Sequence, residues 1–265
     1  MQWVGDEAEK RLAEFFPSLP GERVQNYLWA HTVVCPSCQS VVPLSPNWWL
    51  SKTSNYAGKG QARKVTSDWY AVKPIPNPKK KRVDFELIKG SKGKGTTIKT
   101  DEGEFDPNDY NTISRGVGKC PNCGSVIEDD AIKSQAQSGK LGHQMYAVAF
   151  KKGKGSLEFR LLQNVDFDGV NKANYYLKSQ LYNFQAKNLI PDIQIPYSHM
   201  VHERNATADF GLTHWHKFFN PRQLLTLVTY VEIINDVKLQ LQAEYEPDKV
   251  EAIATYLALI LDRCV

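Results

Sequence analysis

The sequence predicts an α+β fold, and three observations lead to this prediction. Runs of β-branched and aromatic residues, separated by turn residues, recur through the N-terminal part of the chain. Two close pairs of cysteines lie within these runs, and two apolar patterns with helical spacing occupy the C-terminal end. We therefore expect a cysteine ribbon with a basic β-rich insertion, a β-hairpin and C-terminal helices. A chain of 265 residues is long enough to bury a real core.

The N-terminal segment, residues 1–26, is expected to contain one helix. Residues 6–16 place apolar side chains near helical spacing, and acidic residues occupy the first turn, where the helix dipole favours them. Pro17 and Pro20 then end the helix, because proline lacks an amide hydrogen and clashes with the preceding turn. The apolar positions of this helix are Ala8, Leu12, Phe15 and Phe16.

Residues 27–143 are expected to form the cysteine ribbon with its insertion. The segment YLWAHTVVCPSCQSVVPL, residues 27–44, predicts a hairpin, because β-branched runs flank the first cysteine pair on both sides. The second pair, in KCPNCGSVIE, repeats this pattern. Between the pairs, the insertion at about 39–119 predicts strands around Trp69–Val72 and Val83–Ile88. These patterns predict two similar half-sites joined by β structure.

A short helix at Asp129–Gln137 follows the second pair in our reading of the pattern. Residues 144–220 are then expected to form a linking region. Met145–Phe150 and Leu157–Leu162 predict a hairpin around a Gly-rich turn, and a helix is expected from about Asp168 to Lys187.

Residues 221–265 predict a pair of helices. Asn220 is a suitable N-cap, and Pro221 occupies the first helical position, where its missing amide hydrogen costs nothing. A second helix is expected to begin near Pro247. The apolar face of the first helix comprises Leu224, Leu225, Leu227, Val228, Val231, Ile234 and Val237.

Four of the five cysteines predict a structural zinc site. Cys35 and Cys38 form one Cys-Pro-x-Cys turn, Cys120 and Cys123 form another, and four thiolates complete a closed tetrahedral site. The 81 residues between the pairs exceed the usual spacing, but only the two turns must meet. The alternative is a set of reduced core cysteines; redox use is disfavoured, because one pair would suffice for it. Cys264 is most simply a free thiol.

The positive charge is concentrated in the insertion. Between Lys52 and Lys99 there are 13 Lys and Arg residues against three acidic residues, so this stretch carries +10 and the remainder −6 of the net +4. Such a distribution is typical of a surface that faces a polyanion. The cations that we expect to contact DNA are Arg63, Lys64, Lys79, Lys80, Lys81 and Arg82.

The run from Lys79 to Arg82 has two other interpretations, a solvated turn and a nuclear localisation signal. Prolines at positions 74, 76 and 78 favour a turn for this run. Nearby aromatic residues could stack bases, although aromatic residues in small β domains more often form the core. These aromatic residues are Trp48, Trp49, Tyr56, Trp69 and Tyr70.

Other chemistry finds little support in the sequence. The pairs His199/His202 and His214/His216 lack carboxylates at ligand spacing, so core or surface roles are favoured over a second metal site. No phosphate-binding loop, nucleophile elbow or dinucleotide-binding motif occurs. The absence of a long apolar run and of a signal peptide predicts a soluble, cytoplasmic protein without membrane contacts.

Five segments together resemble one protein family: YLWAHTVVCPSC, PNWWLSK, KCPNCGSVI, IPYSHMVHER and FGLTHWHKFFNPRQLL. They resemble zinc-ribbon-containing, adenine-specific DNA methyltransferases that carry an N-terminal domain of unknown function, some of them associated with restriction-modification and anti-phage defence. The resemblance covers nearly the whole chain, from about Arg11 to Val265, and implies an internal segment of a longer enzyme.

The resemblance also implies what this chain lacks. The family's S-adenosylmethionine loop, of the type Asp-Pro-Phe-x-Gly-x-Gly, and its catalytic Asp-Pro-Pro-Tyr motif do not occur here; the nearest string is Asp106-Pro107-Asn108-Asp109. We expect this chain to contact DNA but not to methylate it alone. Its expected partners are DNA and the remainder of the methyltransferase, or a separately encoded catalytic part. The alternative is a zinc-stabilised protein-interaction or architectural module.

Overall fold

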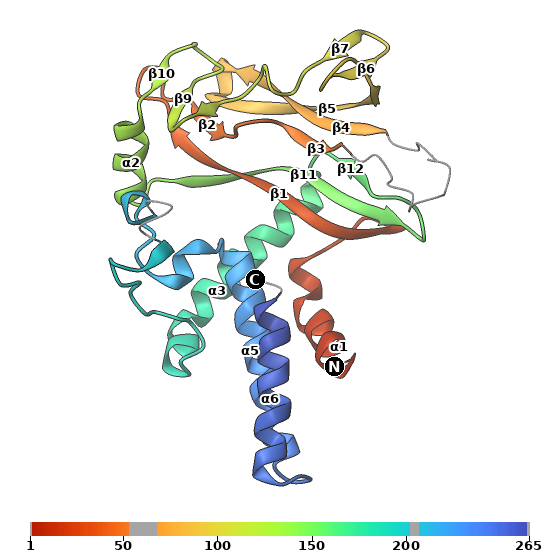
Figure 1. Ribbon diagram of the computed structural model, residues 1–265, viewed down its shortest axis with the longest axis vertical. Helices are drawn as coiled ribbons and strands as arrows, with labels where there is room; N and C mark the ends of the chain where they lie inside the picture. The colour runs from red at the N-terminus through yellow and green to blue at the C-terminus, as the bar shows by residue number, and fades with distance from the viewer. Residues whose placement is uncertain (1, 53–67, 202–206, 264–265) are drawn as a thin grey trace. The chain divides into compact units, whose positions relative to one another are not determined.

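The computed structural model describes residues 2–52, 68–201 and 207–263. The chain divides into two compact units. A β unit comprises residues 20–162 and 205–211, and a helical unit comprises residues 1–19, 163–204 and 212–265. Figure 1 shows their elements. This mixture of helix and sheet is consistent with the predicted α+β class.

The first sheet of the β unit pairs strands that lie far apart in the sequence. Its order is β12-β11-β1-β2, and all pairs are antiparallel. The long central pair joins β1 and β11, from Glu22↔Lys152 to Thr32↔Gly142. Both predicted hairpins are present within this sheet. Their strands are β1 (Glu22–Val34) with β2 (Val41–Leu44), and β11 (Gly142–Lys152) with β12 (Glu158–Arg160).

The insertion forms a second, five-stranded antiparallel sheet, which contains both of its predicted strands. On one face of this sheet, Val72 and the neighbouring Trp48 pack against Ala30 and Ala147 of the first sheet. The two sheets therefore share a hydrophobic core. The strands of the second sheet are β3 (Trp49–Ser51), β4 (Trp69–Asn77), β5 (Arg82–Lys92), β6 (Ile98–Thr100) and β7 (Gly103–Phe105).

The aromatic residues near the cations are mainly buried, and they belong to three different apolar clusters of the β unit. Trp48 is fully buried, and Trp69 and Tyr70 are nearly so. Lysines lie over several of these rings: Lys52 Nζ is 4.4 Å from the centroid of the Trp49 ring. Burial therefore favours the core role of Trp48, Trp69 and Tyr70 over base stacking, while Tyr56 lies outside the described residues.

A small third sheet carries the second cysteine pair. It has the order β10-β9-β8, with β8 (Ile113–Ser114), β9 (Val117–Lys119) and β10 (Val126–Ile127). Helix α2 (Asp129–Gln137) follows, with the predicted bounds, and buries Ile132 and Ala136. Gly118 lies so close to Ile127 that a side chain here would crowd it, with an added Cβ only 3.2 Å from the Cβ of Ile127.

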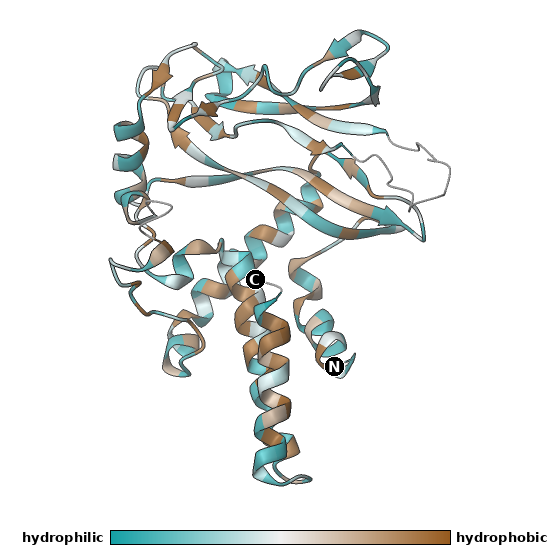
Figure 2. Ribbon diagram, in the orientation of Figure 1, coloured by the Kyte–Doolittle hydropathy of each residue, from teal (hydrophilic) through white to brown (hydrophobic). Residues whose placement is uncertain are grey.

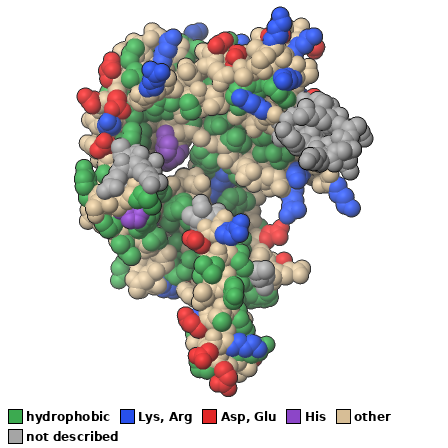
Figure 3. Space-filling model, in the orientation of Figure 1, with side chains coloured by type: hydrophobic (Ala, Val, Ile, Leu, Met, Phe, Trp, Pro, Cys, Tyr) green, Lys and Arg blue, Asp and Glu red, His purple; other side chains and the backbone are tan. Residues whose placement is uncertain are grey.

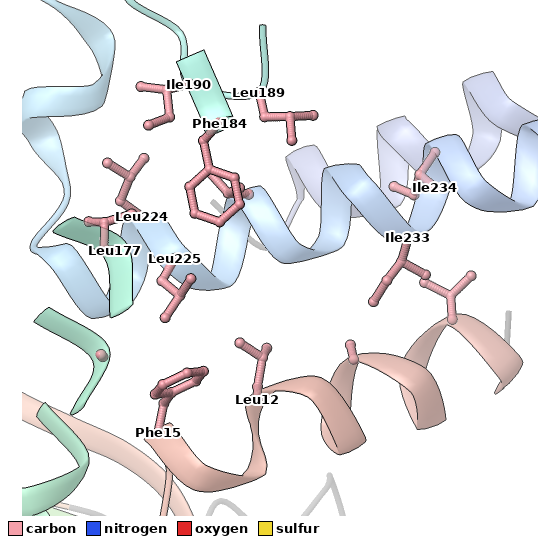
Figure 4. Close-up of a cluster of buried hydrophobic side chains, with 14 of the residues drawn as sticks. Leu12, Phe15, Leu177, Phe184, Leu189, Ile190, Leu224, Leu225, Ile233 and Ile234 are labelled. Carbon is pink, nitrogen blue, oxygen red and sulfur yellow. The ribbon is translucent and has the colours of Figure 1, made fainter. Parts of the chain in front are cut away.

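The helical unit has a single hydrophobic core, shown in Figure 4. Helix α1 contributes Leu12, and the short 3-10 turn after it contributes Phe15. Figure 2 shows long hydrophobic stretches on α5 and α6 and hydrophilic residues where they join. The helices of this unit are α1 (Gln2–Leu12), α3 (Asn164–Ala186), α5 (Pro221–Leu241) and α6 (Pro247–Asp262).

The predicted cap of α5 is present with both of its reciprocal bonds. The Asn220 side chain accepts from the Gln223 amide at 3.0 Å, and the Gln223 side chain accepts from the Asn220 amide at 3.0 Å. This capping box satisfies two amides at the helix start. Close packing also requires Gly169 in α3, because an added Cβ would lie 2.6 Å from Cδ of Pro17.

The two units group the chain differently from the predicted division at 1–26, 27–143, 144–220 and 221–265. Strands β11 and β12 belong to the β unit, because β11 pairs with β1 along most of its length. Helices α1 and α3 share the core of the C-terminal helices. No helix in the described part of the chain is long and apolar enough to cross a membrane.

Candidate metal centre and basic turn

The two cysteine pairs meet in the β unit despite the insertion between them. Cys35 and Cys38 lie in the turn between β1 and β2, whereas Cys120 and Cys123 lie between β9 and β10. The Sγ atoms of Cys35 and Cys123 are 3.8 Å apart, and those of Cys38 and Cys120 are 3.6 Å apart. All four Sγ atoms lie within 4.8 Å of one another, close enough to hold one metal ion.

Both cysteine turns have the same backbone pattern, as their sequence similarity predicts. In the first, Gln39 has a positive φ of 60°, and its amide donates to the Cys35 carbonyl at 2.9 Å. In the second, Gly124 has a φ of 75°, and its amide donates to the Cys120 carbonyl at 2.8 Å. The left-handed position suits Gly124 and is less favourable for Gln39. Each tight turn therefore brings its two cysteine sulfurs to the same side of the turn.

A small apolar cluster and one glutamine position the first turn. Cys35 and Cys120 are fully buried beside Val33 and Ile132. The side-chain amide of Gln135 in α2 pairs with the backbone of Val34 in both directions: Gln135 Oε1 accepts from the Val34 amide at 2.8 Å, and Nε2 donates to the Val34 carbonyl at 2.9 Å. Because Val34 directly precedes Cys35, this pairing fixes the end of β1 at the cluster.

The thiols differ in their protonation because their surroundings differ. Hydrogen bonds from the side chain and backbone of Ser40 lower the pKa of Cys38 to about 6. Burial raises the pKa of Cys120 to about 12. Zn–S bonds of about 2.3 Å in a tetrahedron place sulfurs about 3.8 Å apart, which matches the Cys35–Cys123 and Cys38–Cys120 distances. The four thiols therefore fit a closed metal site of the structural type.

The basic run lies at the tip of the β4–β5 hairpin and forms the predicted turn. A 3-10 turn spans Pro78–Lys80, Asn77 Oδ1 accepts from the Lys80 amide, and Lys81 adopts the left-handed conformation with φ 49°. The four cations of the run differ in their ion pairing. Arg82 Nε pairs with Asp84 at 2.7 Å, whereas Lys79, Lys80 and Lys81 are exposed and form no ion pair with described residues.

Two hydrogen bonds attach this turn to the segments that carry the cysteines, and a third joins the two cysteine turns to each other. The Val41 amide donates to the Lys81 carbonyl at 2.8 Å. Asn122 Nδ2 donates to Ser40 Oγ at 2.8 Å and to the Arg82 carbonyl at 3.1 Å. Asn122 lies between Cys120 and Cys123 and is not a candidate ligand, so no sequence motif pointed to it. The basic turn thus lies beside the metal-capable cluster.

Other cations of the insertion have different surroundings. Arg63 and Lys64 lie outside the described residues. Lys89 pairs with Asp68 at 2.9 Å, and Lys73 Nζ lies 5.8 Å from the centroid of the Tyr110 ring. In Figure 3, Lys and Arg side chains are scattered over the β unit, with acidic side chains between some of them. The concentrated charge in the sequence is therefore partly neutralised in three dimensions.

The histidines form no second metal cluster among the described residues, where the four cysteines are the only such group. His216 Nδ1 lies 3.4 Å from an Asp192 oxygen. His31 and His143, which are 112 positions apart and were not predicted to meet, face each other across β1 and β11, with ring centroids 4.7 Å apart. Burial lowers the pKa of both rings.

No family model, no curated protein and no solved structure matches this chain. The resemblance to DNA methyltransferases is therefore still a prediction from the sequence segments alone.

Proposed function

We propose that the β unit is a zinc-stabilised module that binds nucleic acid through the phosphate backbone. In this proposal, Cys35, Cys38, Cys120 and Cys123 hold one structural zinc ion. Lys79, Lys80 and Lys81 contact successive phosphates. The observation that carries the proposal is the position of three exposed lysines, which form no ion pair with described residues, on a turn bonded to the segments that carry the cysteines.

Zinc is the metal that best suits the donor set. Four thiolates with no open coordination position are typical of structural zinc, and such a site performs no hydrolysis. The β unit is divided into several small apolar clusters, so a metal ion would supply stabilisation that these clusters lack. Our expectation is therefore a structural role for the ion.

The phosphate contact follows from the chemistry of the turn. Lysine is a mobile point charge that tracks a phosphate backbone without reading sequence. Arg82 is already paired with Asp84 and helps to close the hairpin, so the three lysines carry the proposed contacts. Binding through them should release counterions and depend steeply on salt.

The test compares two triple variants of the same charge. In the first, Lys79, Lys80 and Lys81 are changed to Ala. In the control, Lys151, Lys152 and Lys154 are changed to Ala; they are exposed residues at the end of β11 and in the turn that follows it. Affinity for a labelled DNA duplex is measured over a series of salt concentrations.

We expect the first variant to bind every duplex sequence more weakly and to flatten the salt slope by up to about 2.7, at about 0.9 per lost phosphate contact. The control should keep most of the wild-type slope. Equal slopes for the wild type and the first variant would contradict the proposal.

The wider role rests on the sequence resemblance. We propose that the module helps to place DNA for an adenine methyltransferase whose S-adenosylmethionine site lies in other parts of that enzyme or in a separate chain. Saturable binding of S-adenosylmethionine by this chain alone, measured by calorimetry, would contradict the proposal that the cofactor site lies elsewhere.

A second candidate is a protein-interaction module, favoured by the surface of the helical unit. A hollow of about 620 Å³ lies among α1, α5 and α6. Several large apolar side chains around it are exposed. They include Trp3, Tyr245, Tyr256 and Ile260. This candidate predicts that neither triple variant changes DNA affinity.

A further inference from the structure

We propose that the metal site sets the position of the phosphate-binding turn, and that Asn122 is the positioning residue that couples them. This inference rests on the proposed function, because it concerns the same three lysines. It adds that metal binding and nucleic-acid binding are energetically linked.

The first step is that the turn needs outside support. Lys81 occupies the left-handed region with φ 49° and ψ 43°, which is unfavourable for a residue with a side chain. Its carbonyl accepts from the Val41 amide at 2.8 Å, and the next carbonyl, that of Arg82, accepts from Asn122. The two carbonyls that follow the left-handed Cα are thus held by groups from outside the hairpin.

The second step is that one supporting group lies within a metal-binding turn and the other directly follows one. Val41 follows Cys38 by three positions, and the carbonyl of the intervening Ser40 accepts from the Cys35 amide at 2.8 Å. Asn122 directly precedes Cys123. A metal ion that holds the four sulfurs therefore also fixes the two donors that hold the basic turn.

The third step is that the Asn122 side chain joins the two cysteine turns as well as the hairpin. Its Nδ2 donates to Ser40 Oγ at 2.8 Å and to the Arg82 carbonyl at 3.1 Å. Its Oδ1 is buried and has no hydrogen-bond partner within the described structure. Both bonds therefore come from one amide nitrogen, and a single substitution removes them together.

These contacts link metal binding to nucleic-acid binding. If the metal stabilises the turn in the form that binds phosphate, then bound nucleic acid stabilises the metal-loaded form by the same factor. Release of the metal should free the turn, because the positions of Val41 and Asn122 are no longer fixed.

The experiment uses the full chain and the variant Asn122→Ala. Its matched control is Ser37→Ala, because Ser37 is exposed and occupies the corresponding third position of the first Cys-Pro-x-Cys turn. Three quantities are measured on each protein: zinc content, hydrogen exchange at the Val41 amide, and affinity for a DNA duplex at low salt.

We expect Asn122→Ala to keep one zinc per chain, to exchange the Val41 amide about tenfold faster, and to bind DNA about tenfold more weakly, the order of one lost net hydrogen bond. Ser37→Ala should match the wild type in all three. Unchanged exchange and unchanged affinity in zinc-loaded Asn122→Ala would overturn the coupling. If this variant holds less than one zinc, Asn122→Ser is tested instead, because its side chain is too short to reach both Ser40 and the Arg82 carbonyl. Exchange of the Val41 amide and affinity for DNA are then measured on Asn122→Ser, with the same expected results.

The outcomes separate the coupling from the proposed function. If changing the three lysines leaves DNA binding unchanged, the proposed function fails, while the exchange of the Val41 amide still tests the coupling. If the three lysines matter and Asn122 does not, only the coupling fails.

Discussion

The two units of this protein achieve stability by different means. The helical unit has one continuous apolar core, to which α1, α3, α5 and α6 all contribute. The described residues of the β unit form four small clusters, and one of them buries Cys35 and Cys120. We infer that the helical unit is stabilised mainly by buried apolar area. The β unit depends more on specific polar contacts and on its metal-capable cysteines. The two units should therefore respond differently to the same kinds of perturbation.

The largest expected effect is the loss of a cysteine. Cys120→Ser should abolish zinc binding and unfold the region around the cysteine turns, because zinc contributes about 10–16 kcal/mol to the folding of small zinc domains. Hydrogen exchange along the chain measures this. The amides of β2 and β9 should lose protection, whereas those of α5 should keep it. Equal loss in both units would show that they do not fold separately.

Truncating a core side chain in the helical unit should destabilise that unit and leave the cysteine turns of the β unit intact. Leu225 is almost fully buried in α5, so Leu225→Ala should destabilise this unit by about 2–5 kcal/mol. Leu239 lies on the same helix and is 66% exposed, which makes Leu239→Ala the matched control. Thermal unfolding and zinc content are measured together. Zinc content should stay unchanged in both variants, and its loss in Leu225→Ala would contradict independent stabilisation.

A smaller effect is expected at the start of α5. Asn220→Ala removes the side-chain acceptor of the capping box and should cost about 1 kcal/mol. Asn235→Ala, at an exposed position within the same helix, should not destabilise the protein, because alanine has the higher helix propensity. Urea unfolding monitored by helical circular dichroism distinguishes the two. A cap variant as stable as the wild type would show that α5 depends on its core contacts alone.

The smallest expected effect is a pH dependence within the β unit. Burial lowers the pKa of His31 and His143, and the charge of His31 lowers that of His143 further. The unfolded chain therefore binds protons more readily than the folded one, so stability should fall as the pH drops below about 6.5. Both residues keep exposed surface, so the change is small. His31→Asn should flatten this dependence between about pH 5 and 7, and an unchanged dependence would contradict the assignment.

Local patterns made the elements and the cysteine half-sites predictable. Helix α2 has the predicted bounds, and the Asn220 cap has the predicted partner, because both depend on residues a few positions apart. The similar backbone of the two cysteine turns also follows from their similar sequences. The meeting of the turns was predictable from chemistry, since four thiols in two pairs suit one ion.

The contacts that give the site its form were not predictable from the sequence. The pairing of β1 with β11 joins strands more than 100 positions apart, and periodicity does not identify a strand's partner. Gln135 and Asn122 act by bonding to distant backbone groups, and a side-chain amide that does so has no sequence signature. The charge pattern indicated the basic turn, but only the structure separates Arg82, paired with Asp84, from the three lysines that form no ion pair with described residues.

The proposed zinc site is tested most directly by X-ray absorption at the zinc edge, together with elemental analysis of the purified full chain. The account predicts one zinc per chain, with four sulfur neighbours at about 2.3 Å and no nitrogen or oxygen in the first shell. A protein without stoichiometric metal would contradict the account, and so would a shell that contains histidine nitrogen, because the four cysteines would then not form the closed site.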